Sequence, residues 1–134
     1  MYRFNSFTQK ANDVLNLAIK AAENFGHTYI GSEHILVGLL KEGTGVGAIM
    51  LEEKGVSLEK IEELIKKHIG VGTPTRLSPD DFTPRSKRII EVSFQIARGM
   101  LNSFVGTEHI LLSILRESDS YAVHFLNICG IDEE

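Results

Sequence analysis

Hydrophobic side chains recur along most of the chain at steps of three and four residues, the period typical of helices that bury one face. The first such stripe consists of Ala11, Val14, Leu15, Ala18, Ala22 and Phe25. Gly26 follows it, and glycine is the residue that most readily ends a helix in the left-handed conformation. We therefore predict an amphipathic helix that ends at Gly26.

Three further helices are predicted in the first half of the chain. One begins after Ser32, a shorter one extends from about Val46 to Lys54, and a fourth follows Ser57 with its apolar positions between residues 58 and 69. No segment alternates with a period of two for long enough to predict a strand. The pattern indicates an all-α fold.

The same pattern returns after 75 residues without gaps, the signature of an internal repeat. Residues 31–36 (GSEHIL) return as residues 106–111 (GTEHIL), and Phe7-Thr8 returns as Phe82-Thr83. We predict two tandem four-helix repeats, related by pseudo-twofold symmetry and packed into one compact domain. Their bounds are residues 1–70 and 82–134, joined by a linker over residues 71–81 that runs over the surface.

The second repeat is shorter than the first. The counterpart of the helix before Gly70 would end 75 residues later, at position 145, whereas the sequence stops at Glu134. The second repeat is therefore predicted to lack its last helix in this sequence. We expect the sequence to be a piece of a longer protein.

Composition narrows the range of partners. The chain has 14 Lys and Arg against 18 Asp and Glu, and this balance disfavours nucleic acid as the main ligand. Its longest strongly apolar stretch, residues 35–40, is far shorter than the roughly 20 residues that span a bilayer. Residues 1–10 lack the apolar core of a secretory signal, and the single Cys129 fits a reducing compartment. We expect a cytoplasmic domain that contacts neither nucleic acid nor membrane.

Two helix starts carry the residues of an anion site. Pro84 follows Thr83, and proline is favoured at the first helical position, so Thr83 is predicted to cap its helix, as is Thr8 by the repeat. The free amides and the positive end of the dipole at a helix start attract anions. Lys10 and Arg85 lie in the first turn of these helices.

Glu33 and Glu108 form a second recurring pair, each directly after a predicted Ser or Thr cap. A carboxylate can accept two parallel hydrogen bonds from a guanidinium group. If each glutamate lies beside the threonine of its own repeat, the pocket holds a phosphate at one end and a guanidinium at the other. The same residues also make ordinary helix starts, which stabilise a helix by about 1 kcal/mol, and the pattern alone favours that simpler interpretation.

No pattern in the chain indicates catalysis or a metal. His34 and His109 fall in a helix's first turn, where the dipole favours a neutral ring that packs or forms hydrogen bonds. Paired Cys and His ligand spacings are missing from the sequence, and Cys129 lies among apolar residues, as a core thiol does. The glycines at positions 43, 45 and 47 indicate a turn between helices. We predict a binding domain with neither catalytic residues nor a cofactor.

The repeated motif resembles the amino-terminal domain of Clp-family ATP-dependent unfoldases, most nearly those of the ClpC type. The likeness covers essentially the whole chain, and its most specific element is the duplicated G-[ST]-E-H-I-L at residues 31–36 and 106–111. The family fold is a pseudo-twofold pair of four-helix repeats, in agreement with the helical pattern. The second repeat departs from the family in residues 116–121 (RESDSY), which replace an E-G-x-G-like loop, and at Asn102.

The resemblance implies a non-catalytic domain that docks substrates and adaptor proteins for a hexameric AAA+ ring, whose own modules use ATP and feed the ClpP peptidase. In ClpC-type domains two pockets recognise phosphoarginine, a degradation mark. The family's guanidinium-binding glutamates match Glu33 and Glu108, and its helix-start threonines match Thr8 and Thr83. As an alternative, the domain docks adaptors or hydrophobic segments through its helix faces without phosphoarginine, in the manner of ClpA or ClpB.

Overall fold

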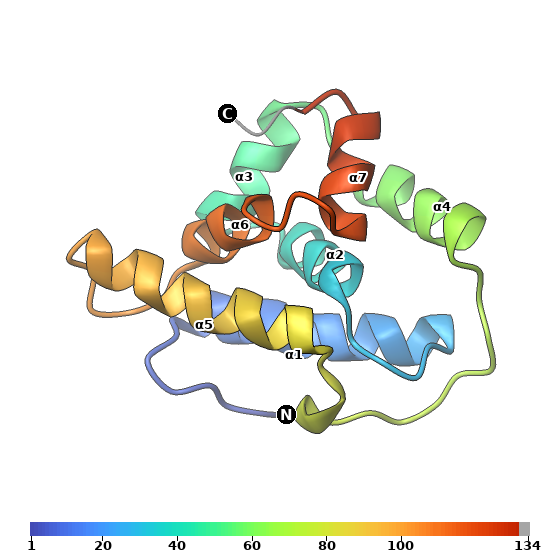
Figure 1. Cartoon of the computed structure of the whole chain (residues 1–134), viewed down its shortest axis with the longest axis horizontal. Helices are drawn as coiled ribbons and strands as arrows, with labels where there is room; N and C mark the ends of the chain where they lie inside the picture. The colour runs from blue at the N-terminus through green and yellow to red at the C-terminus, as the bar shows by residue number, and fades with distance from the viewer. Residues whose placement is uncertain (132–134) are drawn as a thin grey trace.

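The computed structural model describes residues 1–131, which form seven α-helices and one short 3-10 helix (Figure 1). The elements are α1 (Gln9–Phe25), α2 (Ser32–Glu42), α3 (Val46–Glu53), α4 (Leu58–His68), η1 (Pro79–Asp81), α5 (Pro84–Gly99), α6 (Thr107–Leu115) and α7 (Tyr121–Ile128). The all-α prediction is confirmed: this part of the chain holds two isolated β-bridges and no strand. None of these helices is by itself long and apolar enough to cross a membrane, although α2 and α3 together pass that test of length and composition with a bend of 93° between them.

The division into repeats of residues 1–70 and 82–134 stays a prediction, and residues 132–134 lie outside the described part of the chain. Within that part, α5, α6 and α7 each begin 75 residues after α1, α2 and α3. The two halves therefore share the order and the spacing of their first three helices.

The threonine-capped helices begin where the sequence predicts. Thr8 Oγ1 accepts a hydrogen bond from the Ala11 amide at 3.1 Å, and Thr83 Oγ1 accepts one from Ser86 at 3.0 Å. The second helix of each half begins one residue earlier than predicted, with Gly31 and not Ser32 as its N-cap. The His34 ring accepts the Gly31 N–H, the bond that a glutamate or glutamine at this position makes in a capping box.

Each half is built on a pair of packed helices, α1 with α2 and α5 with α6. The predicted α1 stripe is buried throughout. In the stripe that the repeat predicts on α5, four residues are buried and Ile90 is partly buried; its members are Ser86, Ile89, Ile90, Ser93, Ala97 and Met100. Met100 was expected in the core but is 54% exposed. Its counterpart Phe25 is covered because the Gly72 amide binds its carbonyl and His27 stacks on its ring, while no described segment covers the end of α5 in this way.

The linker runs from α4 around the end of α1 to η1 (Figure 1). It is mostly exposed, as predicted, but it is also anchored. The Leu77 amide donates to Glu23 at 2.8 Å, and the Leu77 side chain is buried. At Gly26 the backbone has a φ of 76°, and a Cβ there would overlap the backbone of Gly72. Glycine is required at position 26 for both reasons.

The two halves interlock through their third helices, because α3 packs on α6 and α7 packs on α2. The Thr107 hydroxyl accepts the Gly47 amide of α3 at 2.9 Å, and the Ser32 hydroxyl accepts the Ala122 amide of α7 at 3.2 Å. Each of these hydroxyls therefore satisfies an otherwise free amide at the start of a helix from the other half.

Candidate functional site

Short backbone bridges decide which helix starts meet. The Thr8 amide donates to the Val105 carbonyl at 2.8 Å, which places the start of α1 beside the start of α6. The Thr83 amide donates to the Ile30 carbonyl at 3.1 Å, which places the start of α5 beside the start of α2. In both cases the bridge joins one half of the molecule to the other.

Two pockets lie at these junctions, and we name each after its glutamate. The Glu108 pocket, of about 610 Å³, is lined by Thr8, Gln9, Lys10, Thr44, Gly45, Val46, Asn102, Ser103, Phe104, Gly106, Thr107, Glu108 and His109. The Glu33 pocket, of about 380 Å³, is lined by Tyr29, Gly31, Ser32, Glu33, Thr83, Pro84, Arg85, Asp119, Ser120 and Tyr121.

All six predicted site residues line these pockets. The sequence left open whether each glutamate lies beside the threonine of its own repeat, and in the structure it lies beside the threonine of the other half. Glu108 shares a pocket with Thr8 and Lys10, and Glu33 shares one with Thr83 and Arg85. The bridges between the halves are the physical reason, because they bring each threonine-capped helix to the opposite half.

In the Glu108 pocket, the Lys10 ammonium and the Glu108 carboxylate are not paired with each other. Thr8 caps the Ala11 amide, which leaves the first two amides of α1, those of Gln9 and Lys10, without an acceptor inside the helix. The Lys10 ammonium lies 3.4 Å from the Thr44 carbonyl oxygen. Within residues 1–131, neither Lys10 nor Glu108 forms an ion pair, and Glu108 is half-buried. The pocket therefore presents free donors on one wall and an accessible carboxylate on another.

The Glu33 pocket holds a carboxylate at its base. Glu33 is only 2% exposed, and this burial raises the pKa of its carboxyl group. Its Oε1 lies 3.5 Å from the Ser32 hydroxyl, while Oε2 is buried without a hydrogen-bond partner among the described residues. Burial and the nearby Glu33 charge raise the pKa of Tyr29 to about 12. A buried carboxylate oxygen without a donor is costly, and it is suited to bind one from a ligand.

The cation of the Glu33 pocket already has anionic partners. An Arg85 nitrogen donates to Asp119 Oδ1 at 2.7 Å and lies 3.7 Å from Glu117 Oε1. Arg88 binds the same Glu117 carboxylate through two nitrogens, at 2.7 and 3.1 Å. The hydrogen bond from Arg85 lowers the pKa of Asp119, and the one from Arg88 lowers the pKa of Glu117.

Sequence reasoning missed several lining residues, of which Asp119 and the two tyrosines at positions 29 and 121 change the chemistry most. One signal was available for Asp119: the repeat offset of 75 aligns it with Thr44, which lines the Glu108 pocket. No signal in the sequence indicated that Tyr29 and Glu33 of the first half share a pocket with Asp119 and Tyr121 of the second.

The histidine after each glutamate holds the helix start in place. His34 Nδ1 accepts the Gly31 amide at 2.9 Å, so Nε2 carries the proton and donates to His27 Nδ1 at 2.7 Å. In the second half His109 accepts the Gly106 amide and donates to the Asn102 side-chain oxygen at 2.9 Å. Burial lowers the pKa of His34 to about 3. Both rings are hydrogen-bonded as predicted, and the lowered pKa of His34 favours its neutral form.

Within residues 1–131, no three His, Cys, Asp or Glu side chains gather as metal ligands. Cys129 packs against the edge of the core, where burial raises the pKa of its thiol and so disfavours the nucleophilic thiolate. The chemistry available in the two pockets is therefore the binding of charged and hydrogen-bonding groups.

The family model for the Clp repeat (R) N-terminal domain matches residues 6–129. The chain belongs to this family. Among curated relatives, the chaperone protein ClpB of Oceanobacillus iheyensis is 44% identical over 96% of this chain, and the ClpC/MecB protein of Bacillus subtilis, a negative regulator of genetic competence, is 43% identical over the same share. The chain spans 16% of the length of each of these two relatives.

Solved structures agree on the fold of this Clp N-terminal domain. The N-terminal domain of ClpD from Arabidopsis thaliana has a TM-score of 0.79 at 21% identity, covering 98% of this chain and 90% of that one. The N-domain of ClpV in complex with a VipB peptide has a TM-score of 0.73 at 16% identity, covering 96% of this chain and 80% of that one. At such identities the likeness establishes the fold alone.

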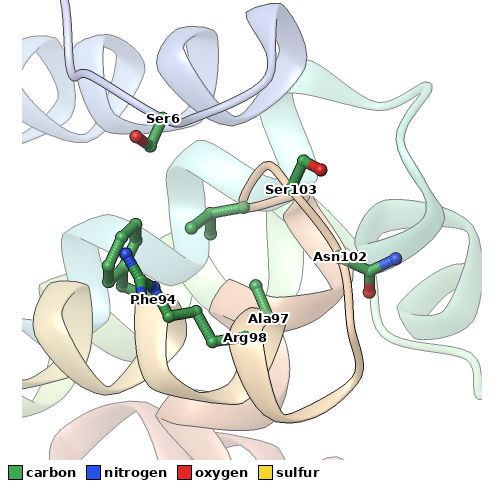
Figure 2. A pocket seen from close by; sticks show the side chains of 7 residues that line it. Ser6, Phe94, Ala97, Arg98, Asn102 and Ser103 are labelled. Carbon is green, nitrogen blue, oxygen red and sulfur yellow. The ribbon is translucent and has the colours of Figure 1, made fainter.

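A third hollow in this Clp N-terminal domain, of about 490 Å³, lies between Ser6 and the end of α5 (Figure 2). Figure 2 shows Arg98 over Phe94, with the guanidinium carbon 4.7 Å from the ring centroid. The other lining residues are Ala97, Asn102, Ser103 and Val105, and none of the seven is acidic. Without a carboxylate, this hollow cannot receive a guanidinium ligand in the way that the two glutamate pockets can.

Proposed function

We propose that this Clp N-terminal domain is a non-catalytic recognition module that binds phosphoarginine side chains and adaptor proteins for a Clp ATPase. One observation carries the proposal: each pocket combines a threonine-capped helix start from one half with a glutamate from the other. Phosphoarginine has the complementary form, with an anionic phosphoryl group joined directly to a planar guanidinium.

In the Glu108 pocket, the proposed ligand lies between the start of α1 and the Glu108 carboxylate. Its phosphoryl group binds the Gln9 and Lys10 amides at the positive end of α1, and the Lys10 ammonium adds a second point charge. The guanidinium N–H groups donate to the Glu108 carboxylate. Arginine offers only the cationic half of this match and phosphoserine only the anionic half, so both bind more weakly.

In the longer protein, the domain delivers marked chains to the ATPase ring, whose modules hydrolyse ATP, and from there to ClpP in the cytoplasm. The likeness to Clp family members supports this placement. The ClpV N-domain bound to a VipB peptide supports peptide docking as a use of the fold.

Isothermal titration calorimetry of the chain with free phosphoarginine tests the proposal. We expect saturable binding that is at least about tenfold tighter than the binding of arginine or phosphoserine, because loss of one charge-assisted contact costs about 1.5 to 3 kcal/mol. The double variant Glu33→Gln/Glu108→Gln keeps the shape of both pockets and should abolish the heat of binding. Absence of binding to the unmodified chain, or unchanged binding in the double variant, would overturn the proposal.

A second candidate function rests on exposed apolar side chains of α3. Val46, Ile49 and Met50 are 50%, 45% and 43% exposed, and together they offer a surface for an adaptor or a hydrophobic segment. An adaptor complex that survives both glutamate substitutions and an excess of phosphoarginine would favour this docking mode. An adaptor displaced by phosphoarginine would favour the pockets.

A further inference from the structure

We propose that the two pockets are not equivalent: Asp119 occupies the anion position of the Glu33 pocket, and only the Glu108 pocket binds phosphoarginine in the native chain. This inference rests on the proposed function and adds to it a residue that decides which pocket is open to the ligand.

The repeat offset allows the two anion positions to be compared residue by residue. Lys10 corresponds to Arg85, and Thr44 corresponds to Asp119. Among residues 1–131, the Lys10 ammonium has one hydrogen-bond partner, the neutral backbone oxygen of Thr44 at 3.4 Å, and forms no ion pair. The Arg85 guanidinium instead forms an ion pair with the Asp119 carboxylate at 2.7 Å. A ligand phosphoryl group can therefore approach Lys10 directly but must displace a carboxylate to reach Arg85.

The glutamate two residues before Thr44, and the one two residues before Asp119, add to the difference between the two anion positions. Glu42 accepts the amides of Thr44 and Gly45, at 3.1 and 2.7 Å, and forms no ion pair among residues 1–131, although the Lys10 charge lies near enough to act on it. Its counterpart Glu117 binds Arg88 and lies 3.7 Å from Arg85. Two carboxylates therefore border the cation of the Glu33 pocket.

The free amides at the two helix starts also favour anion binding in the Glu108 pocket over the Glu33 pocket. The first two residues of α1, Gln9 and Lys10, both carry amide hydrogens, whereas α5 begins with Pro84, which has none. The next amide after Arg85, that of Ser86, is already bound to the Thr83 hydroxyl. The helix start in the Glu33 pocket thus offers an anion one free amide where the other pocket offers two.

Access to the glutamates differs as well. Glu33 is 2% exposed at the base of the smaller pocket, while Glu108 is half-buried in the larger one. A ligand that binds Glu33 must therefore reach a covered carboxylate and also compete with Asp119 for Arg85. For these combined reasons we expect phosphoarginine to bind the Glu33 pocket at least about tenfold more weakly than the Glu108 pocket.

A reciprocal exchange of the two corresponding residues tests this inference by calorimetry with phosphoarginine. The native chain should bind one equivalent, and this site should be lost in Glu108→Gln and retained in Glu33→Gln. Asp119→Thr gives the second pocket the residue of the first, and should add a second binding site. Thr44→Asp places the carboxylate in the first pocket, and should weaken the native site by about tenfold or more. Circular dichroism of each variant confirms that the helices are retained, and Asp119→Asn serves as a second, nearly isosteric neutral variant.

Each outcome bears on a separate statement. Two equal sites in the native chain, or a site that survives Glu108→Gln, would overturn the inequivalence while leaving phosphoarginine binding in place. The inequivalence also fails if neither Asp119→Thr nor Asp119→Asn gains a site. Absence of binding in the native chain and in both Asp119 variants would overturn the proposed function itself, and this inference with it.

Discussion

The imidazole of His34 is held by partners that leave no place for a second ring proton. It accepts the Gly31 amide at Nδ1 and donates from Nε2 to His27, which in turn bonds the Gly70 carbonyl oxygen at 2.8 Å. All of these bonds are satisfied when both rings are neutral. The chain of bonds therefore ties the start of α2, next to the Glu33 pocket, to the end of α4.

We expect this arrangement to make stability depend on pH. Burial lowers the pKa of His34 from 6.5 to about 3, so between these values the unfolded chain takes up a proton that the folded ring excludes. The stabilising effect is complete above pH 6.5 and is lost as the pH falls toward 3, by up to about 1.4 kcal/mol per pH unit. Urea unfolding at a series of pH values between about 7 and 5 measures this slope.

The buried Glu33 acts with the opposite sign, because its raised pKa favours the folded state on acidification. The titration is therefore also made with Glu33→Gln, in which the loss of stability with falling pH should be at least as steep as in the native chain. A flat profile in this variant would show that His34 is protonated in the folded state.

At the scale of the helices, α1 and α2 approach closely because Gly38 has no side chain. A Cβ at this position would overlap the carbonyl oxygen of Val14. The corresponding pair, α5 and α6, has room for Ser113, whose hydroxyl donates to the Ile89 carbonyl oxygen at 2.7 Å. The two helix pairs thus pack at the same repeat position with different residues, glycine in the first pair and serine in the second.

Gly38→Ala should destabilise the domain by about 2 kcal/mol, although alanine is favoured over glycine inside a helix by about 1 kcal/mol. The overlap with a backbone atom forces the two helices apart and exceeds the gain in helix propensity. The matched change Ser113→Ala removes one buried hydrogen bond and should cost about 1 kcal/mol. Chemical unfolding of both variants measures the difference, and a Gly38→Ala protein as stable as the native chain would contradict the close contact.

At the scale of the whole molecule, neither half completes a pocket. Each pocket combines a helix start from one half with a glutamate from the other, and the third helix of each half packs on the second helix of its neighbour. The hydroxyls of Ser32 and Thr107 also join the halves, because each accepts a backbone amide from the other half. We therefore expect folding and the proposed ligand binding to require both halves.

We expect residues 1–78 alone to lack a cooperative thermal transition and to bind no phosphoarginine, because separation exposes the apolar faces of α2 and α3 to water. Circular dichroism of this segment, of residues 79–134 and of their equimolar mixture measures the effect. The mixture should regain helicity and binding. An isolated first half that melts at the temperature of the whole chain would show that the halves are independent.

The sequence by itself determined the features that depend on near neighbours. The buried stripe of α1, the threonine caps of α1 and α5 and the end of α1 at Gly26 all follow from residues within one or two helical turns. The resemblance to the Clp family was likewise visible in the repeated motif of residues 31–36 and 106–111. Even at this local level the start of α2 was misplaced by one residue, because the N-cap is Gly31, whose amide is accepted by the His34 ring three residues later.

Only the tertiary structure decided which of these helix starts share a pocket. The bridge between Thr8 and Val105 joins residues that are far apart in the chain, and no local pattern encodes such a contact. It places Glu108 with Lys10, and the bridge between Thr83 and Ile30 likewise places Glu33 with Arg85. Periodicity reports which face of a helix is buried, whereas the partner of that face depends on the packing of all the helices at once.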